Sequence, residues 1–403
     1  SFQLSHKNVF MKYSKHVFLS IPTLLILFLS CDQKEIGIGI QTFQISDENI
    51  ADFDEVVTSI EFIPLKNKSD EPVNLNCSIW NLKVTENFLV YTTLCNPESK
   101  IHLFDLNGNY LKSFARSGDG PEEYQSMQGV DLNQDTLSIT AGGGIIKQYH
   151  FPDFEFIGTI NLDEEAMFIP YFTKISATKW LTSPIYNGKL DENGKYNLYK
   201  IIDSSDGKSF ELPVSTTPLT SEISEGEFTK LGQSYLLNYA FSDTLFLFQN
   251  EKLTPYASLD FGDRAPSAED LQMDGTQLEA TITSQPFAFN MGKIWQTDSV
   301  SRLKTFALAK NPNMDIANMR TFPIHEVFIN HNTKKVTAFP SLAGWSNGKG
   351  DAKDGFFYDA LRTDDWLYAL ENGSLGKYGE QLETRMRELK DFEDPILIKY
   401  QVK

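Results

Sequence analysis

Cysteine, histidine and basic residues are scarce in this chain. Among 403 residues there are three cysteines and six histidines, and 36 lysines and arginines stand against 54 aspartates and glutamates. Three cysteines are too few for a scaffold held together by disulfides. The formal net charge of −18 argues against a nucleic-acid partner, because a surface that binds phosphates needs a basic stripe.

Motifs of common catalytic and metal sites are also missing. The sequence has no Gly-x-Ser-x-Gly elbow for a nucleophilic serine, no His-Glu-x-x-His and no cysteine pair at the spacing of zinc ligands. We therefore predict no catalytic residue and no zinc site. Apolar residues make up 41% of the chain and aromatic residues 13%, which suffices for a large packed core and excludes a disordered chain.

The first thirty residues have the pattern of a secretory signal. Lys12 and Lys15 precede the run from Val17 to Ser30 (VFLSIPTLLILFLS), which is apolar except for hydroxyls and one proline. This run is shorter than the about 20 residues of a membrane-spanning helix, and a basic segment before a short apolar run is typical of a signal peptide. We expect translation to begin at Met11, with residues 1–10 lying upstream of the start.

The apolar run ends in Phe28-Leu29-Ser30-Cys31, which resembles a bacterial lipobox. The resemblance implies cleavage before Cys31 and lipidation of this cysteine, with residues 31–40 as a tether. Phe28 departs from the leucine usual at that position. The polar segment DQKE (32–35) resembles the tag that follows the lipidated cysteine in surface-exposed lipoproteins of Bacteroidetes. The predicted location is the outer membrane, reached by the lipid anchor, and the periplasmic and outer faces both stay open.

The two other cysteines can be paired from the register of a predicted hairpin. Two strand-like runs lie on either side of a turn, and with the centre of that turn at Glu86, Trp80 faces Thr92 and Cys77 faces Cys95. Directly opposed Cβ atoms lie about 4.5–5.5 Å apart, close to the separation in a disulfide. Export would place both residues in an oxidising compartment. We predict a Cys77–Cys95 disulfide; the alternative is two reduced cysteines.

One β unit recurs along the body of the chain. It consists of an apolar strand, a turn with Asp, Asn or Gly, and a second strand, and it occurs at 101–114, 145–160, 198–212, 244–261 and 326–339. Shorter strands precede several copies. Four-stranded antiparallel units repeated at about 45 residues or more are typical of propeller blades.

The ends of the chain must supply a sixth unit. Residues 395–402 form a clear terminal strand, 366–370 indicate another, and 57–65 have no hairpin partner of their own. Pairing of N-terminal and C-terminal strands would remove an exposed sheet edge. We predict an all-β fold, a six-bladed β-propeller over residues 41–403 closed by its terminal strands. We expect short helical insertions: residues 266–282 indicate a helix or a loop excursion, and 376–390 an amphipathic helix, because apolar residues there have helical spacing.

Four segments carry a resemblance to a known family: 59–65, 113–124, 241–263 and 394–403. The chain resembles the six-bladed β-propeller lipoproteins of Bacteroidetes, related in architecture to TolB-like and NHL-type propellers. The family usually shows Gly-x-Gly-Pro-Gly-Glu-Tyr in the second segment, where this chain has GDGPEEY (118–124). Glu122 thus replaces a glycine, and a positive φ at this position would strain the backbone. The resemblance implies a fold rather than a function.

The loop at 113–124 is the best candidate for ligand contact. It follows the outer strand of one predicted blade and leads to the inner strand of the next, so it must cross a face toward the central opening. Five side chains could reach a ligand there: Arg116, Asp119, Glu122, Glu123 and Tyr124. The alternative is structural: Gly-Pro turns the chain, Glu123 accepts backbone N–H groups and Tyr124 packs between blades.

Two further candidates concern sugars and calcium. Trp80, near a predicted inner strand, could stack on a sugar ring. Some six-bladed propellers hold Ca²⁺ on the axis with carboxylate and amide oxygens, and Asp131 and Asn81 lie on or near predicted innermost strands. We expect no cofactor, with calcium as the one that stays open.

The sequence does not reveal a ligand. Our leading interpretation is a non-enzymatic, lipid-anchored propeller of the cell envelope, whose face and axial funnel bind a glycan, another small molecule or an envelope protein. The first alternative is a calcium-dependent hydrolase or lactonase with an axial metal site. The second is a scaffold for assembly of envelope complexes.

Overall fold

The computed structural model describes residues 40–66, 73–74, 77–95, 99–162, 168–185, 197–214, 227–274, 276–277, 280–281, 287–309, 314–315, 318–342, 349–389 and 395–403. The predicted signal peptide, its cleavage site and Cys31 lie outside the described residues. Within the described part of the chain, no helix is long and apolar enough to cross a membrane. Residues 40–403 form a single unit.

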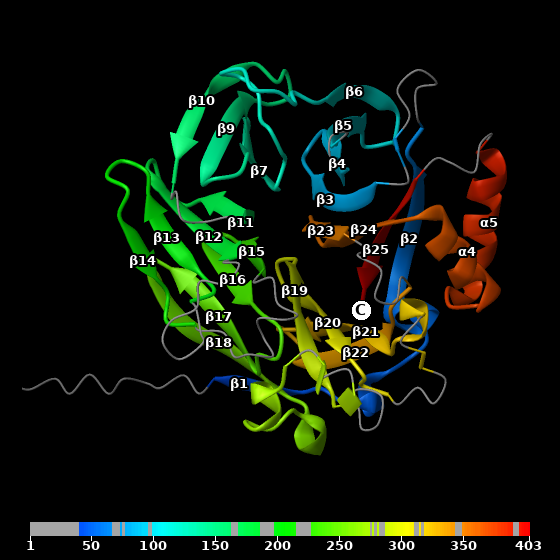
Figure 1. The fold of residues 1–403 in the computed structure, drawn as a ribbon. Helices are drawn as coiled ribbons and strands as arrows, with labels where there is room; N and C mark the ends of the chain where they lie inside the picture. Colours follow the sequence, from blue (N-terminus) through cyan, green and yellow to red (C-terminus); the bar gives the residue numbers. More distant parts are fainter. Residues whose placement is uncertain are drawn as a thin grey trace, which may run out of the picture. The chain divides into compact units, whose positions relative to one another are not determined.

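Six sheets surround a common axis, and each runs from an innermost to an outermost strand (Figure 1). The first blade contains, from the inside outwards, β3 (Ser78–Val84), β4 (Phe88–Leu94), β5 (Lys100–Asp105) and β6 (Tyr110–Phe114). The second contains β7 (Gly129–Asn133), β8 (Thr136–Thr140), β9 (Ile145–His150) and β10 (Phe156–Asn161). The third contains β11 (Phe168–Lys174), β12 (Lys179–Ile185), β13 (Lys200–Asp203) and β14 (Ser209–Glu211).

Of the other three blades, the fourth and the sixth include a strand from the N-terminus. The fourth contains β15 (Glu227–Leu231), β16 (Ser234–Asn238), β17 (Thr244–Gln249) and β18 (Lys252–Asp260), with β1 (Gln41–Gln44) outside them. The fifth contains β19 (Phe289–Gln296), β20 (Val300–Phe306), β21 (Ile324–Asn330) and β22 (Lys335–Pro340). The sixth contains β23 (Lys349–Lys353), β24 (Phe356–Leu361), β25 (Ile396–Val402) and β2 (Val57–Pro64).

The predicted six-bladed β-propeller is confirmed. Each of the five repeated units is the outer hairpin of a blade, from β5–β6 in the first to β21–β22 in the fifth. The terminal strands close the ring as expected, because β2 pairs antiparallel with β25 from Val57 opposite Val402 to Pro64 opposite Ile396. The outermost strand of the sixth blade therefore comes from the N-terminus.

Neighbouring blades are held together by apolar side chains on both faces of the central strands. In β4, Leu89 and Tyr91 are buried in a cluster shared with the sixth blade, whereas Val90 between them is buried in a cluster shared with the second blade. Successive side chains of a strand point to opposite faces. In β4 both faces are therefore apolar at Leu89, Val90 and Tyr91 instead of alternating with polar residues.

The N-terminal segment does more than close the ring. Before it reaches β2, it adds β1 in parallel to β18 of the fourth blade. It then bridges to β22 of the fifth blade at Ile50 and Ala338, where the Ala51 N–H donates to the Ala338 carbonyl at 2.9 Å. We call residues 41–64 the N-terminal belt, because they run along the outer edges of three successive blades (Figure 1).

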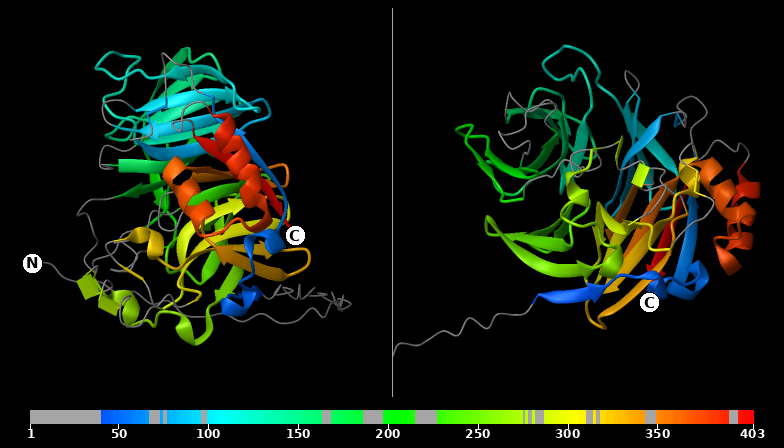
Figure 2. Two further views of the ribbon diagram at one scale, coloured as in Figure 1. Left: turned by 90° about the vertical axis from the view of Figure 1, so that its right-hand side faces the viewer. Right: turned by 60° about the horizontal axis from the view of Figure 1, so that its bottom comes forward.

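Short helices accompany the belt and the closing strand. Among the elements whose bounds the structure describes, the α-helices are α1 (Phe53–Val56), α4 (Thr363–Glu371) and α5 (Gly379–Glu388), and the 3₁₀ turns are η1 (Asp47–Asn49), η2 (Gly262–Arg264), η3 (Asp270–Gln272), η4 (Met319–Thr321) and η5 (Gly376–Tyr378). Figure 2 shows α4 and α5 beside the sixth blade, where Leu382 and Met386 pack against Phe62 of β2 and its neighbours. The helix expected within 376–390 is confirmed.

The strand predicted at 366–370 is wrong, because these residues lie in α4. Asp364 and Asp365 occupy its first turn, where carboxylates interact favourably with the helix dipole. Trp366 is fully buried, and its indole N–H donates to the Ile396 carbonyl at 3.0 Å. A run of aromatic and aliphatic residues this short has no periodicity that separates a helix from a strand.

The hairpin of β3 and β4 contains a bulge that the predicted register lacked. Asn81 pairs with Thr92 and Ile79 with Thr93, so Trp80 is the extra residue. The predicted pairing of Trp80 with Thr92 is wrong by one position. Beyond the bulge the register returns to the predicted one, and a disulfide joins Cys77 to Cys95 with Cα atoms 4.9 Å apart.

Candidate functional site

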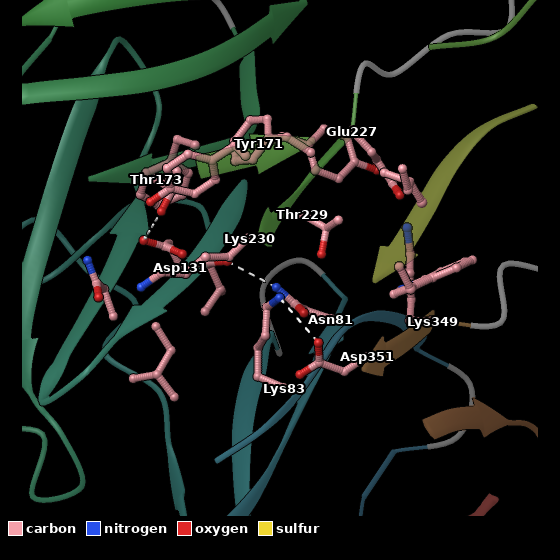
Figure 3. Close-up of a pocket in the computed structure, with 18 of the residues that line it drawn as sticks. Asn81, Lys83, Asp131, Tyr171, Thr173, Glu227, Thr229, Lys230, Lys349 and Asp351 are labelled. Carbon is pink, nitrogen blue, oxygen red and sulfur yellow. Dashed lines mark hydrogen bonds and ion pairs between the residues drawn. The ribbon is translucent and has the colours of Figure 1, made fainter. Parts of the chain in front are cut away.

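A cavity of about 330 Å³ lies on the axis of the propeller, and all six innermost strands contribute to its walls (Figure 3). Six charged side chains line it: Lys83, Asp131, Glu227, Lys230, Lys349 and Asp351. We call this cavity the axial pocket. Its volume lies at the small end of the range of about 300–1,000 Å³ for ligand pockets.

Lys83 and Asp351 connect the first blade to the sixth across one wall of the pocket. Their charged groups lie 3.7 Å apart. The carboxylate of Asp351 also accepts hydrogen bonds from the backbone N–H of Val84 at 2.7 Å and from its neighbour Ala352 at 2.9 Å. The Asp351 carboxylate raises the pKa of Lys83 and outweighs the opposing effect of burial. Lys83 therefore carries its charge throughout the physiological pH range.

Asp131 and Asn81, the predicted calcium candidates, both line the axial pocket. Burial raises the pKa of Asp131 to about 6, although nearby Lys83 favours the charged form and Thr173 donates a hydrogen bond to the carboxylate at 3.1 Å. The Asn81 side-chain amide donates to the Val130 carbonyl at 3.0 Å. Among the residues that the structure describes, no three His, Cys, Asp or Glu side chains are grouped so that they could hold a metal ion.

Glu227 is the third acidic residue of the pocket, and it has a lysine partner of its own. Its carboxylate makes an ion pair with Lys293, whose ammonium also donates to the Tyr171 hydroxyl at 3.1 Å. Burial by itself raises the pKa of Glu227, but the ammonium groups of Lys293 and Lys349 outweigh burial and hold this pKa below its ordinary value. Glu227 is therefore ionised near neutral pH.

Aromatic and hydroxyl side chains complete the lining. Tyr171, Phe228 and Tyr235 are half-buried at the pocket, and the rings of the last two meet edge to face at 6.2 Å between centroids. Trp295 is almost fully buried, and its indole N–H donates to the Gly350 carbonyl at 2.8 Å. Half-buried rings beside charged groups can bind a ligand that has both an apolar face and polar edges.

The predicted ligand-binding loop at 113–124 is tied to itself. Backbone hydrogen bonds of 3.0–3.1 Å join Tyr124 to Arg116 and Gly118, and the carboxylate of Glu123 accepts the Gly120 N–H at 2.9 Å. Arg116 forms an ion pair with Glu122. Tyr124 is 2% exposed in the cluster between the first and second blades. These contacts are the ones expected from the structural alternative, in which Glu123 accepts backbone N–H groups and Tyr124 packs between blades.

The loop lies beside the third strand of the second blade. Tyr149 and Lys147 of β9 donate to the carbonyls of Glu122 and Pro121, at 2.8 and 2.7 Å. Asp119 accepts a hydrogen bond of 2.9 Å from Gln125. Glu122 is not among the described residues with positive φ, so its replacement of the family's glycine causes no strain of that kind.

The structure therefore separates the predicted site residues into two groups. No residue of 113–124 is among those that line the axial pocket in the described part of the chain, whereas Asp131 and Asn81 both line it. The side chain of Trp80 lies outside the described part of the structure. Contact of the loop or of Trp80 with a ligand stays a prediction.

Comparison with known proteins assigns the chain to a family. A family model matches residues 40–398. The chain belongs to the family described as domain of unknown function DUF4934. No curated protein sequence matches it.

Solved structures share the fold of this DUF4934 chain. A protein of Bacteroides fragilis, described as a candidate exported protein, superposes with a TM-score of 0.67 at 14% identity, covering 90% of this chain and 99% of that one. The WD40 repeats of RRP9 superpose with a TM-score of 0.44 at 9% identity, covering 86% and 99% of the two chains. At these identities the first match shows the fold alone, and the second is too weak to bear on function.

The pocket of this DUF4934 chain contains lysines that the sequence analysis missed. Lys230 and Lys349 lie on innermost strands that were not recognised, because the repeat was identified from its outer hairpins. The stretch that contains β23 is polar and rich in glycine, which suggests a loop. The useful signal would have been charged residues on the innermost strand of each blade. These residues can be recognised as pocket residues only after the innermost strands have been assigned to the axis.

Proposed function

We propose that this chain is an exported, non-enzymatic binding module, held at the outer membrane by a lipid on Cys31, and that its ligand site is the axial pocket. The observation that carries the proposal is a cavity of about 330 Å³ to which all six blades contribute polar, charged and aromatic side chains. The leader sequence supports export, as does the description of the Bacteroides fragilis protein with the same fold as a candidate exported protein.

The state of the pocket carboxylates favours binding over the calcium-dependent alternative. Asp351 and Glu227 each have a lysine partner, and Asp131 is flanked by Lys83 and accepts a hydrogen bond from Thr173. Calcium needs six to eight oxygen ligands, several of them carboxylates. Lysines between the carboxylates would repel the cation, so we give calcium no part in the proposed function.

A variant that fills the pocket tests where the ligand binds. Thr229 lines the pocket and is half-buried, so Thr229→Trp should occlude it. We expect a ligand found by thermal-shift screening of sugars, sugar acids and dipeptides to bind Thr229→Trp at least about tenfold more weakly, a cost of about 1.4 kcal/mol. Calorimetric titration of the mature chain gives both affinities. At 100 times its dissociation constant, a ligand should stabilise the wild-type chain by about 2.7 kcal/mol.

The matched control is Thr254→Trp, at an exposed position of β18 in the outer hairpin of the same blade as Thr229. It should bind the ligand as the wild type does. Equal affinity of wild type and Thr229→Trp would place the ligand elsewhere, and Glu122→Gln would then ask whether the 113–124 loop contacts it. Ester hydrolysis that requires Ca²⁺ and disappears in Thr229→Trp would favour the hydrolase alternative instead.

Lipidation is tested separately. Replacement of Cys31 by alanine removes the thiol to which the lipid would be attached. We expect Cys31→Ala to lose incorporation of labelled palmitate and to move from the membrane fraction to the soluble fraction, because the acyl chains would be the stable anchor. Unchanged labelling and fractionation would refute the lipid anchor and would leave the proposal about the axial pocket as it stands.

A further inference from the structure

The chain as a whole is strongly acidic, but lysines gather at the axial pocket. Lys83, Lys230 and Lys349 come from three different innermost strands, β3, β15 and β23, so their ammonium groups approach the axis from three sides (Figure 3). Lys293 from β19 adds a fourth ammonium beside Glu227. A protein with a net charge of −18 thus places a group of lysines at the centre of its ring.

The carboxylates of the pocket are already engaged by the protein. Asp351 accepts two backbone N–H groups and pairs with Lys83, and Glu227 pairs with Lys293. These contacts neutralise both acids without a ligand. The lining itself has three lysines and three carboxylates. Counting Lys293, which pairs with Glu227 from beside the lining, the site has an excess of one positive charge when Asp131 is ionised, and of two when it is protonated.

The local charge governs what an entering ligand meets. Salt screens exposed charges beyond about 8 Å at physiological ionic strength, so the acids on the outer surface of the propeller contribute little inside the pocket. Groups that line a cavity with low-dielectric walls concentrate their field there. An anion is therefore favoured in the pocket although the chain as a whole repels anions.

Resting on the function proposed above, we propose that the axial pocket binds a small hydroxylated anion, a sugar acid or sugar phosphate of one or two rings, whose acidic group is held by Lys83, Lys230 and Lys349. Lysine is a point-charge donor that serves carboxylate and phosphate equally. The side chains of Thr229 and Asn133 supply hydrogen-bonding groups for hydroxyls. The half-buried rings of Phe228 and Tyr235 supply a face for a sugar ring.

Asp131 adds a pH dependence to this site. The groups that face it are Lys83 on β3, Lys230 on β15, Thr173 and the backbone N–H of Lys174 on β11, and Tyr235 on β16. Because burial raises its pKa to about 6, Asp131 is largely charged at pH 7.5 and largely neutral at pH 5. Its negative charge weakens anion binding at the higher pH. The affinity for an anion should therefore rise as the pH falls through 6.

Calorimetric titration of the mature chain with four matched sugars tests the inference: galacturonate, galactose 6-phosphate, galactose and galactosamine. We expect either anion, or both, to bind at least about tenfold more tightly than the neutral and cationic sugars. The difference between the two anions identifies carboxylate or phosphate as the source of the charge. Galacturonate stays ionised at pH 5 and is the probe for the pH series, because the charge of phosphate itself changes near pH 6.

Variants assign the effect to the pocket. Lys230→Gln and Lys349→Gln should each weaken binding of the preferred anion about five- to tenfold, which is the worth of about 1–1.4 kcal/mol. Lys252→Gln, on the exposed outer strand of the blade that contains Lys230, should bind as the wild type does. Asp131→Asn keeps the shape of the protonated acid, and at pH 7.5 it should bind galacturonate as tightly as the wild type does at pH 5. Unchanged melting temperatures show that the variants are folded.

The outcomes separate this inference from the function on which it rests. Binding of galactose or galactosamine as tightly as the anions, with loss in Thr229→Trp, would leave the binding module in place and overturn the anion specificity. Tight anion binding that survives both lysine substitutions would also overturn it. Failure of all four sugars, with another compound of the wider screen bound in the pocket, would refute the ligand class alone. Failure of every compound would refute both proposals.

Discussion

Replacement of Arg302 by methionine is expected to lower the free energy of unfolding by about 3–5 kcal/mol, the usual cost of removing one partner from a buried ion pair. Arg302 on β20 is 1% exposed. Its guanidinium donates to Glu326 at 2.8 Å and to Asp359 at 2.7 Å, and it thus joins the fifth blade to the sixth. Methionine keeps most of the volume but leaves two carboxylates without their main partner.

Chemical denaturation with urea measures the effect, and Arg387→Met is the matched control. Arg387 is 77% exposed and pairs with Glu383 on the surface of α5, and exposed ion pairs contribute about 0–1 kcal/mol. Substitution of Glu326 by glutamine and Asp359 by asparagine in the Arg302→Met background should recover part of the loss, since neutral amides do not need the guanidinium. A loss in Arg302→Met no larger than in the control would contradict the assigned role.

The loss should also depend on pH. In the wild type, burial raises the pKa of Glu326, but Arg302 and Lys304 outweigh burial and hold this pKa below its ordinary value. A depressed pKa means that Glu326 stabilises the fold above its ordinary pKa and that this stabilisation is lost as the pH falls. In Arg302→Met both carboxyl groups would take up protons more readily in the folded state. The stability difference between wild type and variant should therefore be smaller at pH 5 than at pH 8.

The same network supports a wall of the axial pocket. The Arg302 guanidinium lies 4.4 Å from the ring centroid of Trp295, which lines the pocket. Gly350, also in the lining, lies so close to Asp359 that a Cβ atom would be 2.7 Å from its carboxylate oxygen. Because the buried ions lie directly behind two pocket residues, loss of Arg302 should weaken ligand binding as well as stability.

Local sequence pattern was enough to predict the ring. The outer hairpins repeat an apolar strand, a turn with Asp, Asn or Gly and a second strand, and each copy proved to be the outer half of a blade. Closure could be predicted because the strands at 57–65 and 395–402 had no local partners, and an unpaired edge is unfavourable. The pairing of Cys77 with Cys95 was predicted by counting positions across one turn, but the count was wrong by one next to the turn and agrees only beyond the bulge at Trp80.

Interactions between distant segments could not be predicted in the same way. β23 (KGDAK) has no apolar side chain larger than alanine, because it faces the polar pocket and not a packed interface. Lys83 and Asp351 are far apart in sequence, so no local sequence pattern predicts their ion pair. The 113–124 loop was expected at the central opening from its connectivity alone, whereas its hydrogen bonds to β9 place it beside the third strand of the blade.

The second large effect on stability is expected from a substitution in the N-terminal belt. Phe53 in α1 is 4% exposed, and its ring meets those of Phe339, Tyr378 and Tyr400 at centroid distances of 4.9, 6.1 and 6.3 Å. These partners belong to β22, η5 and the closing strand β25. Phe53→Ala should lower the free energy of unfolding by about 3–5 kcal/mol, the usual cost of removing a buried phenylalanine side chain.

Phe210→Ala is the matched control, because Phe210 is 54% exposed on β14 and surface substitutions usually change stability by less than about 0.5 kcal/mol. Native-state hydrogen exchange can show where the loss is felt. If the belt joins the fourth, fifth and sixth blades, then amides of β1, Ala51 and β2 should exchange faster in Phe53→Ala, while those of β9 in the second blade keep their protection. Faster exchange confined to α1, with β1 and β2 unchanged, would show that the belt is a set of separate contacts. Ring closure would then depend on the pairing of β2 with β25 alone.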